Sequence, residues 1–176
     1  MFLMLTVVFM TVAAADDFKR ERRDGEKYAE RNKAKDALEG KTPPVLAVTN
    51  WQNTDGKELT LEGLKGKVVV LDFWGVWCGP CRAAMPHLKE LYEKHQESGL
   101  VVIGVHTKNQ GEKMAEYVRE ADLTWPIALD AEGETVKAFA VDSYPDYYLI
   151  DRRGDLRVAD LANGDLDRAV ELLLKE

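Results

Sequence analysis

The sequence predicts an α/β domain in which a central mixed β-sheet is flanked by helices. Two apolar runs rich in β-branched residues, 68–74 and 100–105, have the composition of strands covered on both faces. Stretches with apolar residues at helical spacing lie between these runs and at the end of the chain. Strands separated by helices, followed by a strand pair and a last helix, indicate one mixed sheet between helices.

The first half of the domain is expected to hold a hairpin, a buried strand and a long helix. Residues 45–53 and 57–61 flank Asp55-Gly56, a pair that strongly favours a hairpin turn. After the strand at 68–74, a helix is expected from Gly79 to about Glu97. One face of it carries Leu88, Leu91, Tyr92 and His95 at helical spacing.

The second half repeats the alternation and then ends in an antiparallel pair. Strands are expected at 100–105 and 125–129, with helices around 114–121 and 132–140. The pair of strands 147–150 and 156–161 turns at Arg153-Gly154. Leu166, Val170 and Leu173 form the apolar face of a closing helix.

Composition narrows the function classes. A chain of 176 residues with a formal net charge of −7 has room for one domain plus tails, and its charge disfavours nucleic acid as a partner. The two cysteines are too few for a disulfide scaffold, and the three histidines show no ligand spacing for a metal. The sequence holds no glycine-rich phosphate loop, so no cofactor is expected.

The N-terminus resembles an export signal. Residues 1–12 are apolar except for Thr6 and Thr11, and Ala13-Ala14-Ala15 then precedes an abrupt change to acidic residues. An apolar core before a small-residue site predicts a signal peptide over 1–15, and therefore a periplasmic or secreted protein. Because no basic residue precedes the apolar run, the alternative is an uncleaved membrane anchor.

A charge-dense segment, residues 16–43, separates this signal from the domain predicted at 44–176. Its first 25 residues hold eight basic and eight acidic side chains, with few apolar residues and no sustained helical stripe. Such a composition is typical of a solvated linker, helical at most near residues 34–38 and ended by Gly40 and Pro43-Pro44. A partner-binding helix is the alternative.

The chemistry centres on Trp77-Cys78-Gly79-Pro80-Cys81, which lies between a predicted buried strand and a helix. A Cys-x-x-Cys pair in that place indicates a redox centre. Cys78 falls at the exposed helix start, where free N–H groups and the helix dipole favour the thiolate. Cys81, buried one turn later, can attack a mixed disulfide formed by Cys78. Gly79 lets a substrate backbone approach, and Pro80 suits the first turn.

Asp72 is an acid inside the apolar run 68–74. Burial raises the proton affinity of a carboxylate, so Asp72 can exchange protons near neutral pH. It precedes the cysteines closely enough to lie beneath them, and we assign it as the proton acceptor for Cys81. The alternative is that Asp72 points to solvent at the end of the sheet.

Tyr144-Pro145 stands just before the strand at 147–150. A proline there marks a special turn, and an X-Pro bond is the kind that adopts the cis form at modest cost. A cis turn facing the cysteines would leave the Tyr144 backbone free to pair with an extended substrate segment. From composition alone, a trans proline in an ordinary loop remains open.

Residues 56–91 resemble the thioredoxin superfamily, in its exported TlpA/ResA-like branch, which is grouped with the alkyl hydroperoxide reductase/thiol-specific antioxidant proteins. The resemblance rests on Asp55-Gly56-Lys57, on residues 64–74, on Trp77 to Arg82 and on Met85-Pro86, and it extends over about 44–176. It implies a thioredoxin fold with a helix-containing insertion at about 109–130. It also implies a cis Pro145, with residues 141–151 as the proline turn and the strand that follows.

The sequence departs from this resemblance at three positions. Branch members dedicated to cytochrome c maturation resemble one another in a glutamate three residues after the second cysteine, where this chain has Ala84. A cytochrome-maturation role is therefore disfavoured. Asp146 stands where the family more often has threonine, and Tyr144 is bulky. Both are expected to face an incoming substrate and to alter the choice of partner.

These features predict a thiol–disulfide oxidoreductase that acts on protein disulfides or dithiols, exported and reducing. Its substrate surface is expected at Trp77, Gly79, Pro80, Tyr144 and Pro145. A reductant outside the cytoplasm needs a donor of electrons, for which a membrane protein is the natural source. The alternatives are a thiol peroxidase, against which Gly75 stands where peroxiredoxins carry a hydroxyl, and a non-catalytic binding module.

Overall fold

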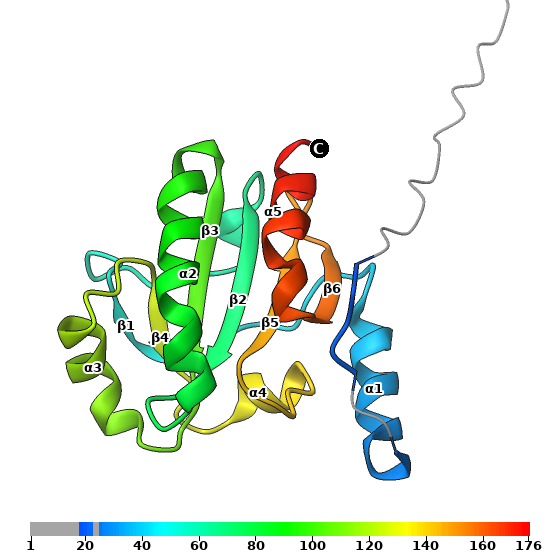
Figure 1. Cartoon of the computed structure of the whole chain (residues 1–176), viewed down its shortest axis with the longest axis horizontal. Helices are drawn as coiled ribbons and strands as arrows, with labels where there is room; N and C mark the ends of the chain where they lie inside the picture. The colour runs from blue at the N-terminus through cyan, green and yellow to red at the C-terminus, as the bar shows by residue number, and fades with distance from the viewer. Residues whose placement is uncertain (1–17, 23–24) are drawn as a thin grey trace, which may run out of the picture.

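The computed structural model describes residues 18–22 and 25–176. The predicted signal peptide, residues 1–15, lies outside the described residues. One mixed sheet of six strands forms the centre, in the order β1-β4-β3-β2-β5-β6. Helices cover it (Figure 1). The predicted mixed sheet between helices is therefore confirmed. The strands are β1 Thr49–Gln52, β2 Val68–Trp74, β3 Leu100–His106, β4 Ile127–Leu129, β5 Asp146–Ile150 and β6 Leu156–Leu161.

The helices are α1 Glu26–Leu38, α2 Gly79–His95, α3 Met114–Glu120, α4 Glu134–Ala138 and α5 Leu166–Leu174. Helix α3 is the helix of the expected insertion. Within the part of the chain described, no helix is both long and apolar enough to cross a bilayer.

Strand β2 is the centre of the sheet and divides two apolar cores. It pairs in parallel with β3 and antiparallel with β5, and all seven of its residues are buried. Because side chains alternate along a strand, Val70 and Trp74 enter the core beneath α2 and α5, whereas Phe73 enters the core on the other face. Asp72 has the parity of Val70 and Trp74, so it lies on the face that α2 covers.

The predicted hairpin over 45–61 is wrong, although its turn is present. Asp55 and Gly56 both adopt positive φ, at 53° and 75°, as the Asp-Gly signal predicts. Residues 57–60 form no strand, and β1 pairs instead with β4, antiparallel. The side chains of 57–61 are exposed or only partly buried. That stretch therefore offers no buried face to stabilise a local pair, whereas β4 offers a free sheet edge.

The charged N-terminal segment is not a solvated linker over its described residues. Phe18 is 3% exposed and joins the core beneath α5. Helix α1 is longer than the expected 34–38 and packs beside β6 (Figure 1). Backbone bonds tie both ends of the segment to that strand: Glu21 N–H donates to Asp160 O at 2.9 Å and Gly40 N–H to Leu156 O at 2.7 Å.

Candidate active site

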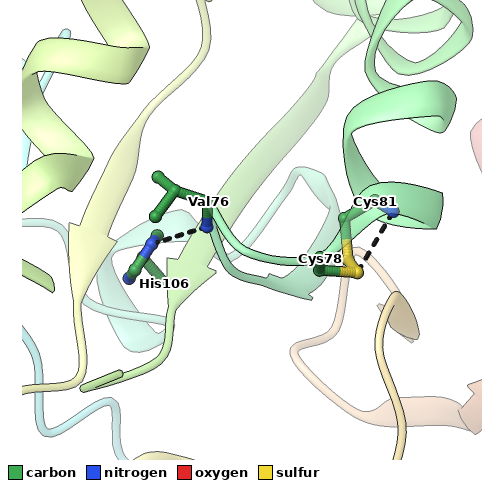
Figure 2. Close-up of a disulfide and its surroundings, with 4 residues drawn as sticks. All are labelled: Val76, Cys78, Cys81 and His106. Carbon is green, nitrogen blue, oxygen red and sulfur yellow. Dashed lines mark hydrogen bonds between the residues drawn. A yellow bond between two sulfur atoms is a disulfide. The ribbon is translucent and has the colours of Figure 1, made fainter. Parts of the chain in front are cut away.

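The two cysteines form a disulfide at the start of α2, with an S–S distance of 2.05 Å (Figure 2). Cys78 is the N-cap residue, and its Sγ accepts a hydrogen bond from the Cys81 N–H at 3.2 Å. Pro80 occupies the first turn, as its missing N–H allows. The helix N-terminus and this N–H both favour a negative charge on Cys78 in the reduced protein.

Solvent exposure does not separate the two sulfur positions as the sequence suggested. Cys78 is 4% exposed and Cys81 is 2% exposed, so the expected open position of Cys78 is not found in the disulfide form. What differs is their place on α2, because Cys78 precedes the first turn and Cys81 lies inside it. Gly79 and Pro80, between them, are exposed and form the open surface of the motif.

Trp77 forms a partial cover beside the pair. Its side chain is 39% exposed. Its ring packs edge to face against the ring of Tyr144, with 5.4 Å between the ring centroids. Gly75 makes this position available, because a Cβ there would lie 2.6 Å from Trp77 Nε1. Tyr144 is half-buried, and burial raises the pKa of its hydroxyl. The two aromatic residues that the sequence assigned to substrate binding are therefore in contact.

The Tyr144-Pro145 peptide bond is cis, as the resemblance implied. Pro145 is buried, and β5 begins at the next residue. Asp146 does not face an incoming substrate. Its side chain is 0% exposed and lies 3.3 Å from Lys35 Nζ, so the prediction for this residue is wrong. Burial removes Asp146 from the surface because a lysine of α1, which local sequence could not place there, pairs with it.

Asp72 is buried, at 3% exposure, on the sheet face that carries α2. It lies opposite Tyr147 in the β2–β5 register, and its Oδ1 has no hydrogen-bond partner among the described residues. Burial raises its pKa from 3.8 to about 7. The solvated alternative is therefore excluded, and the carboxyl group can gain or lose a proton near neutral pH.

His106 is a site residue that sequence reasoning left without a role. It ends β3, is 0% exposed, and its Nε2 accepts from the Val76 N–H at 3.0 Å (Figure 2). Since Val76 N–H can only donate, Nδ1 carries the proton and donates to Thr107 O at 2.5 Å. Burial lowers the pKa of His106, which keeps the ring neutral. This bond fixes the loop two residues before Cys78.

A cleft of about 460 Å³ opens beside the aromatic pair. Trp77 and Tyr144 line it together with Val136, Lys108, Lys137 and Glu132. The cleft is therefore partly apolar, carries charge at its rim, and includes two residues of the expected substrate surface. The cleft reaches Trp77, the residue directly before Cys78.

Comparison with known proteins agrees with this geometry. The thiol-disulfide oxidoreductase ResA of Bacillus thuringiensis is 38% identical over 115 residues, which are 65% of this chain and 65% of that protein. The protein DipZ of Mycobacterium tuberculosis is 36% identical over 143 residues, 78% of this chain and 20% of that protein. This chain thus spans just under two thirds of the length of the Bacillus ResA relatives and a fifth of the length of DipZ.

Solved structures share the fold. The thioredoxin domain of a thiol-disulfide oxidoreductase from Bacteroides vulgatus aligns with a TM-score of 0.64 and 25% identity, covering 76% of this chain and 97% of that one. A Chlorobium tepidum protein provisionally assigned as the thiol:disulfide interchange protein DsbE aligns with a TM-score of 0.67 and 27% identity. The alignment covers 77% of this chain and 97% of that one. The fold is thus the thioredoxin fold. The AhpC/TSA family profile matches residues 14–159, and the chain belongs to the AhpC/TSA family.

Proposed function

We propose that this protein is a thiol–disulfide oxidoreductase that reduces disulfides of protein substrates through Cys78 and Cys81. The observation that carries the proposal is the cysteine pair at the N-terminus of α2, where the Cys81 N–H already donates to the Cys78 sulfur. ResA-type relatives, named as thiol-disulfide oxidoreductases, support the same chemistry.

In the first step, the Cys78 thiolate attacks one sulfur of a substrate disulfide. The substrate S–S bond breaks, a mixed disulfide with Cys78 forms, and one substrate thiolate leaves. The substrate segment lies across the cleft beside Trp77 and Tyr144, and it pairs with the backbone before Pro145.

In the second step, Cys81 attacks the Cys78 sulfur. Asp72, on the sheet face beneath α2, takes the proton of the Cys81 thiol, directly or through water. The second substrate thiolate leaves, the Cys78–Cys81 disulfide forms, and two electrons have passed from the pair to the substrate. A membrane-bound donor protein then returns two electrons to the pair.

Export completes the proposal. The apolar run at residues 1–12, followed by Ala13-Ala14-Ala15, supports a place outside the cytoplasm, with residues 1–15 as the signal. Mass spectrometry of the protein from its native compartment should find Asp16 at the N-terminus. An intact N-terminus on a soluble cytoplasmic protein would refute export.

Trapping tests the roles of the two cysteines. Cys81→Ser should accumulate mixed disulfides between Cys78 and its substrates, because the resolving thiol is gone, whereas Cys78→Ser should accumulate few. Non-reducing gels with mass spectrometry of the adducts measure this. The reverse pattern would exchange the two roles, and no adducts with either variant would argue for a binding module.

Equilibration with glutathione tests the direction of electron flow. A reductant should have a potential near that of thioredoxin, about −270 mV, and an oxidant one nearer −120 mV. A value at the oxidising end would overturn the reducing role while leaving the cysteine chemistry in place.

A further inference from the structure

A buried cation from the N-terminal helix lies behind the proline turn. Lys35 is the only buried residue of α1, and its side chain is 0% exposed. Lysine is almost never fully buried unless it is paired. Here Nζ lies 2.7 Å from Asp142 Oδ1, 2.7 Å from Asp160 Oδ2 and 3.3 Å from Asp146 Oδ2.

Two of these three acids bracket the turn that carries Pro145. Asp142 precedes the proline by three residues, and Asp146 follows it directly. A single ammonium group therefore joins the chain entering the turn to the chain leaving it. The third acid, Asp160, belongs to β6 and connects the same group to the sheet.

Lys35 supplies the cation that joins these three buried acids, and burial together with the neighbouring Asp160 raises the pKa of Asp146 well above its ordinary value, so Asp146 can hold a proton. The carboxylates of Asp142, Asp146 and Asp160 are at most 4% exposed, so water screens their mutual repulsion poorly. Arg22 adds a second cation, because its Nη1 lies 3.3 Å from the same Oδ2 of Asp160 that Lys35 contacts. Burial alone would lower the pKa of Lys35, but the surrounding carboxylates outweigh that effect and raise it, so the lysine stays charged.

We propose that Lys35 is a positioning residue that holds the turn of residues 142–146 in the shape that receives substrate. The charged segment before the domain would then complete the active site, through a lysine more than a hundred residues away in the sequence. This inference rests on the proposed function, because substrate is taken to pair with the turn. It assigns Lys35 no contact with substrate or with either sulfur.

Removal of the ammonium group should affect binding more than chemistry. Without Lys35, the ammonium group that joins Asp142 to Asp146 is lost, Asp142 is left buried without its cation, and the turn would open. The cysteine pair is held by α2 and by the bond between His106 and Val76, so its intrinsic reactivity should persist.

The test compares Lys35→Met, which keeps the length of the side chain, with Arg20→Met as the control. Arg20 lies in the same N-terminal segment and pairs with Glu39 at 2.6 Å. With insulin as the disulfide substrate and dithiothreitol to reduce the Cys78–Cys81 disulfide after each turnover, Lys35→Met should raise KM about tenfold, within the range for residues of one ion-pair network. The kcat, and the rate with the small disulfide 5,5′-dithiobis(2-nitrobenzoate), should change less than about twofold. Arg20→Met should leave KM near the wild-type value.

Hydrogen–deuterium exchange gives a readout that needs no activity. Lys35→Met should speed exchange in peptides that cover residues 141–148 and leave the middle of α2 unchanged. A folded Lys35→Met protein with wild-type KM and wild-type exchange at the turn would overturn the proposal, whatever its melting temperature.

A second variant and the activity of the wild type cover the cases in which Lys35→Met does not fold or the protein is inactive. If Lys35→Met does not fold, Asp142→Asn replaces it in the test. That change removes the ion pair between Lys35 and residue 142 and leaves Lys35 paired with Asp146 and Asp160. A raised KM and faster hydrogen–deuterium exchange at the turn in Asp142→Asn would support the positioning role of Lys35, and wild-type values would overturn it. A wild-type protein that reduces neither insulin nor the small disulfide would refute the proposed function, and the exchange data alone would then judge Lys35.

Discussion

Replacement of Asp72 by asparagine separates the effect of this buried acid on the stability of the protein from its role as a base in catalysis. The carboxyl group is enclosed between β2 and α2, and burial raises its pKa from 3.8 to about 7. The folded protein therefore binds a proton at Asp72 over a pH range in which the unfolded chain has released it. Between these two pKa values the stability of the protein falls as the pH rises.

The size of the loss in stability follows from the rise in the pKa of Asp72. A rise in pKa from 3.8 to about 7 corresponds to about 4 kcal/mol of destabilisation once the pH is well above the folded pKa. The asparagine side chain carries no charge at any pH, so this destabilisation would vanish in the variant. The buried amide still lacks a partner where Oδ1 lies, which costs about 1–3 kcal/mol. A net gain of about 1–3 kcal/mol near pH 8 is expected for Asp72→Asn.

Urea melts of the disulfide form at two pH values provide the assay. The advantage of Asp72→Asn over the wild type should be about 2.5 kcal/mol larger near pH 8 than near pH 5. The comparison between pH values cancels the cost of the amide, which does not titrate. An equal stability difference at both pH values would show that Asp72 does not titrate between them, and the argument from burial would be wrong.

Kinetic measurements test whether Asp72 acts as the proton acceptor for Cys81. In single-turnover reduction of insulin near pH 7, Asp72→Asn should slow the resolution of the mixed disulfide by about 10²–10⁴-fold, the usual contribution of a positioned base. Formation of the mixed disulfide, which depends on Cys78, should be less affected. Wild-type rates across the pH range would make Asp72 a structural residue.

Two more predictions concern the loop before the cysteines. Gly75→Ala should displace the Trp77 ring, shift tryptophan emission and destabilise the protein by about 1–3 kcal/mol, whereas Gly79→Ala, with open space at its Cβ, should do neither. Because burial lowers the pKa of His106, its contribution to stability should fall as the pH drops below 6.5. Urea melts of wild type and His106→Asn should therefore converge in acid, and parallel curves would contradict a neutral buried ring.

Local sequence predicted the elements whose signals are local. The boundaries of β2 match the apolar run 68–74, because a strand in the middle of a sheet needs apolar side chains on both faces. The start of α2 follows from the Cys-Gly-Pro-Cys motif and its proline in the first turn. The pairing of β1 with β4 could not be read in this way, because a sheet edge some 75 residues later selected its partner.

The candidate site divides along the same line. Cys78, Cys81 and the buried acid Asp72 are placed by one strand and the helix after it, so a short stretch of sequence suffices to predict them. Lys35 carries no such signal, since α1 is polar on all sides and a lysine in a charged segment reads as exposed. Its three partners come from parts of the chain more than a hundred residues away, and only the folded structure brings them together.

The contacts between the N-terminal segment and β6 also bear on solubility. Strand β6 ends the sheet, and an unpaired edge strand is a template on which another chain can add. Residues 19–21 and 40–41 occupy backbone groups at the two ends of that edge, with α1 packed between them. Proteolytic loss of the residues before 42 would expose a strand that includes Leu156, Val158 and Leu161, and dimers or fibrils joined through this edge would be the expected products.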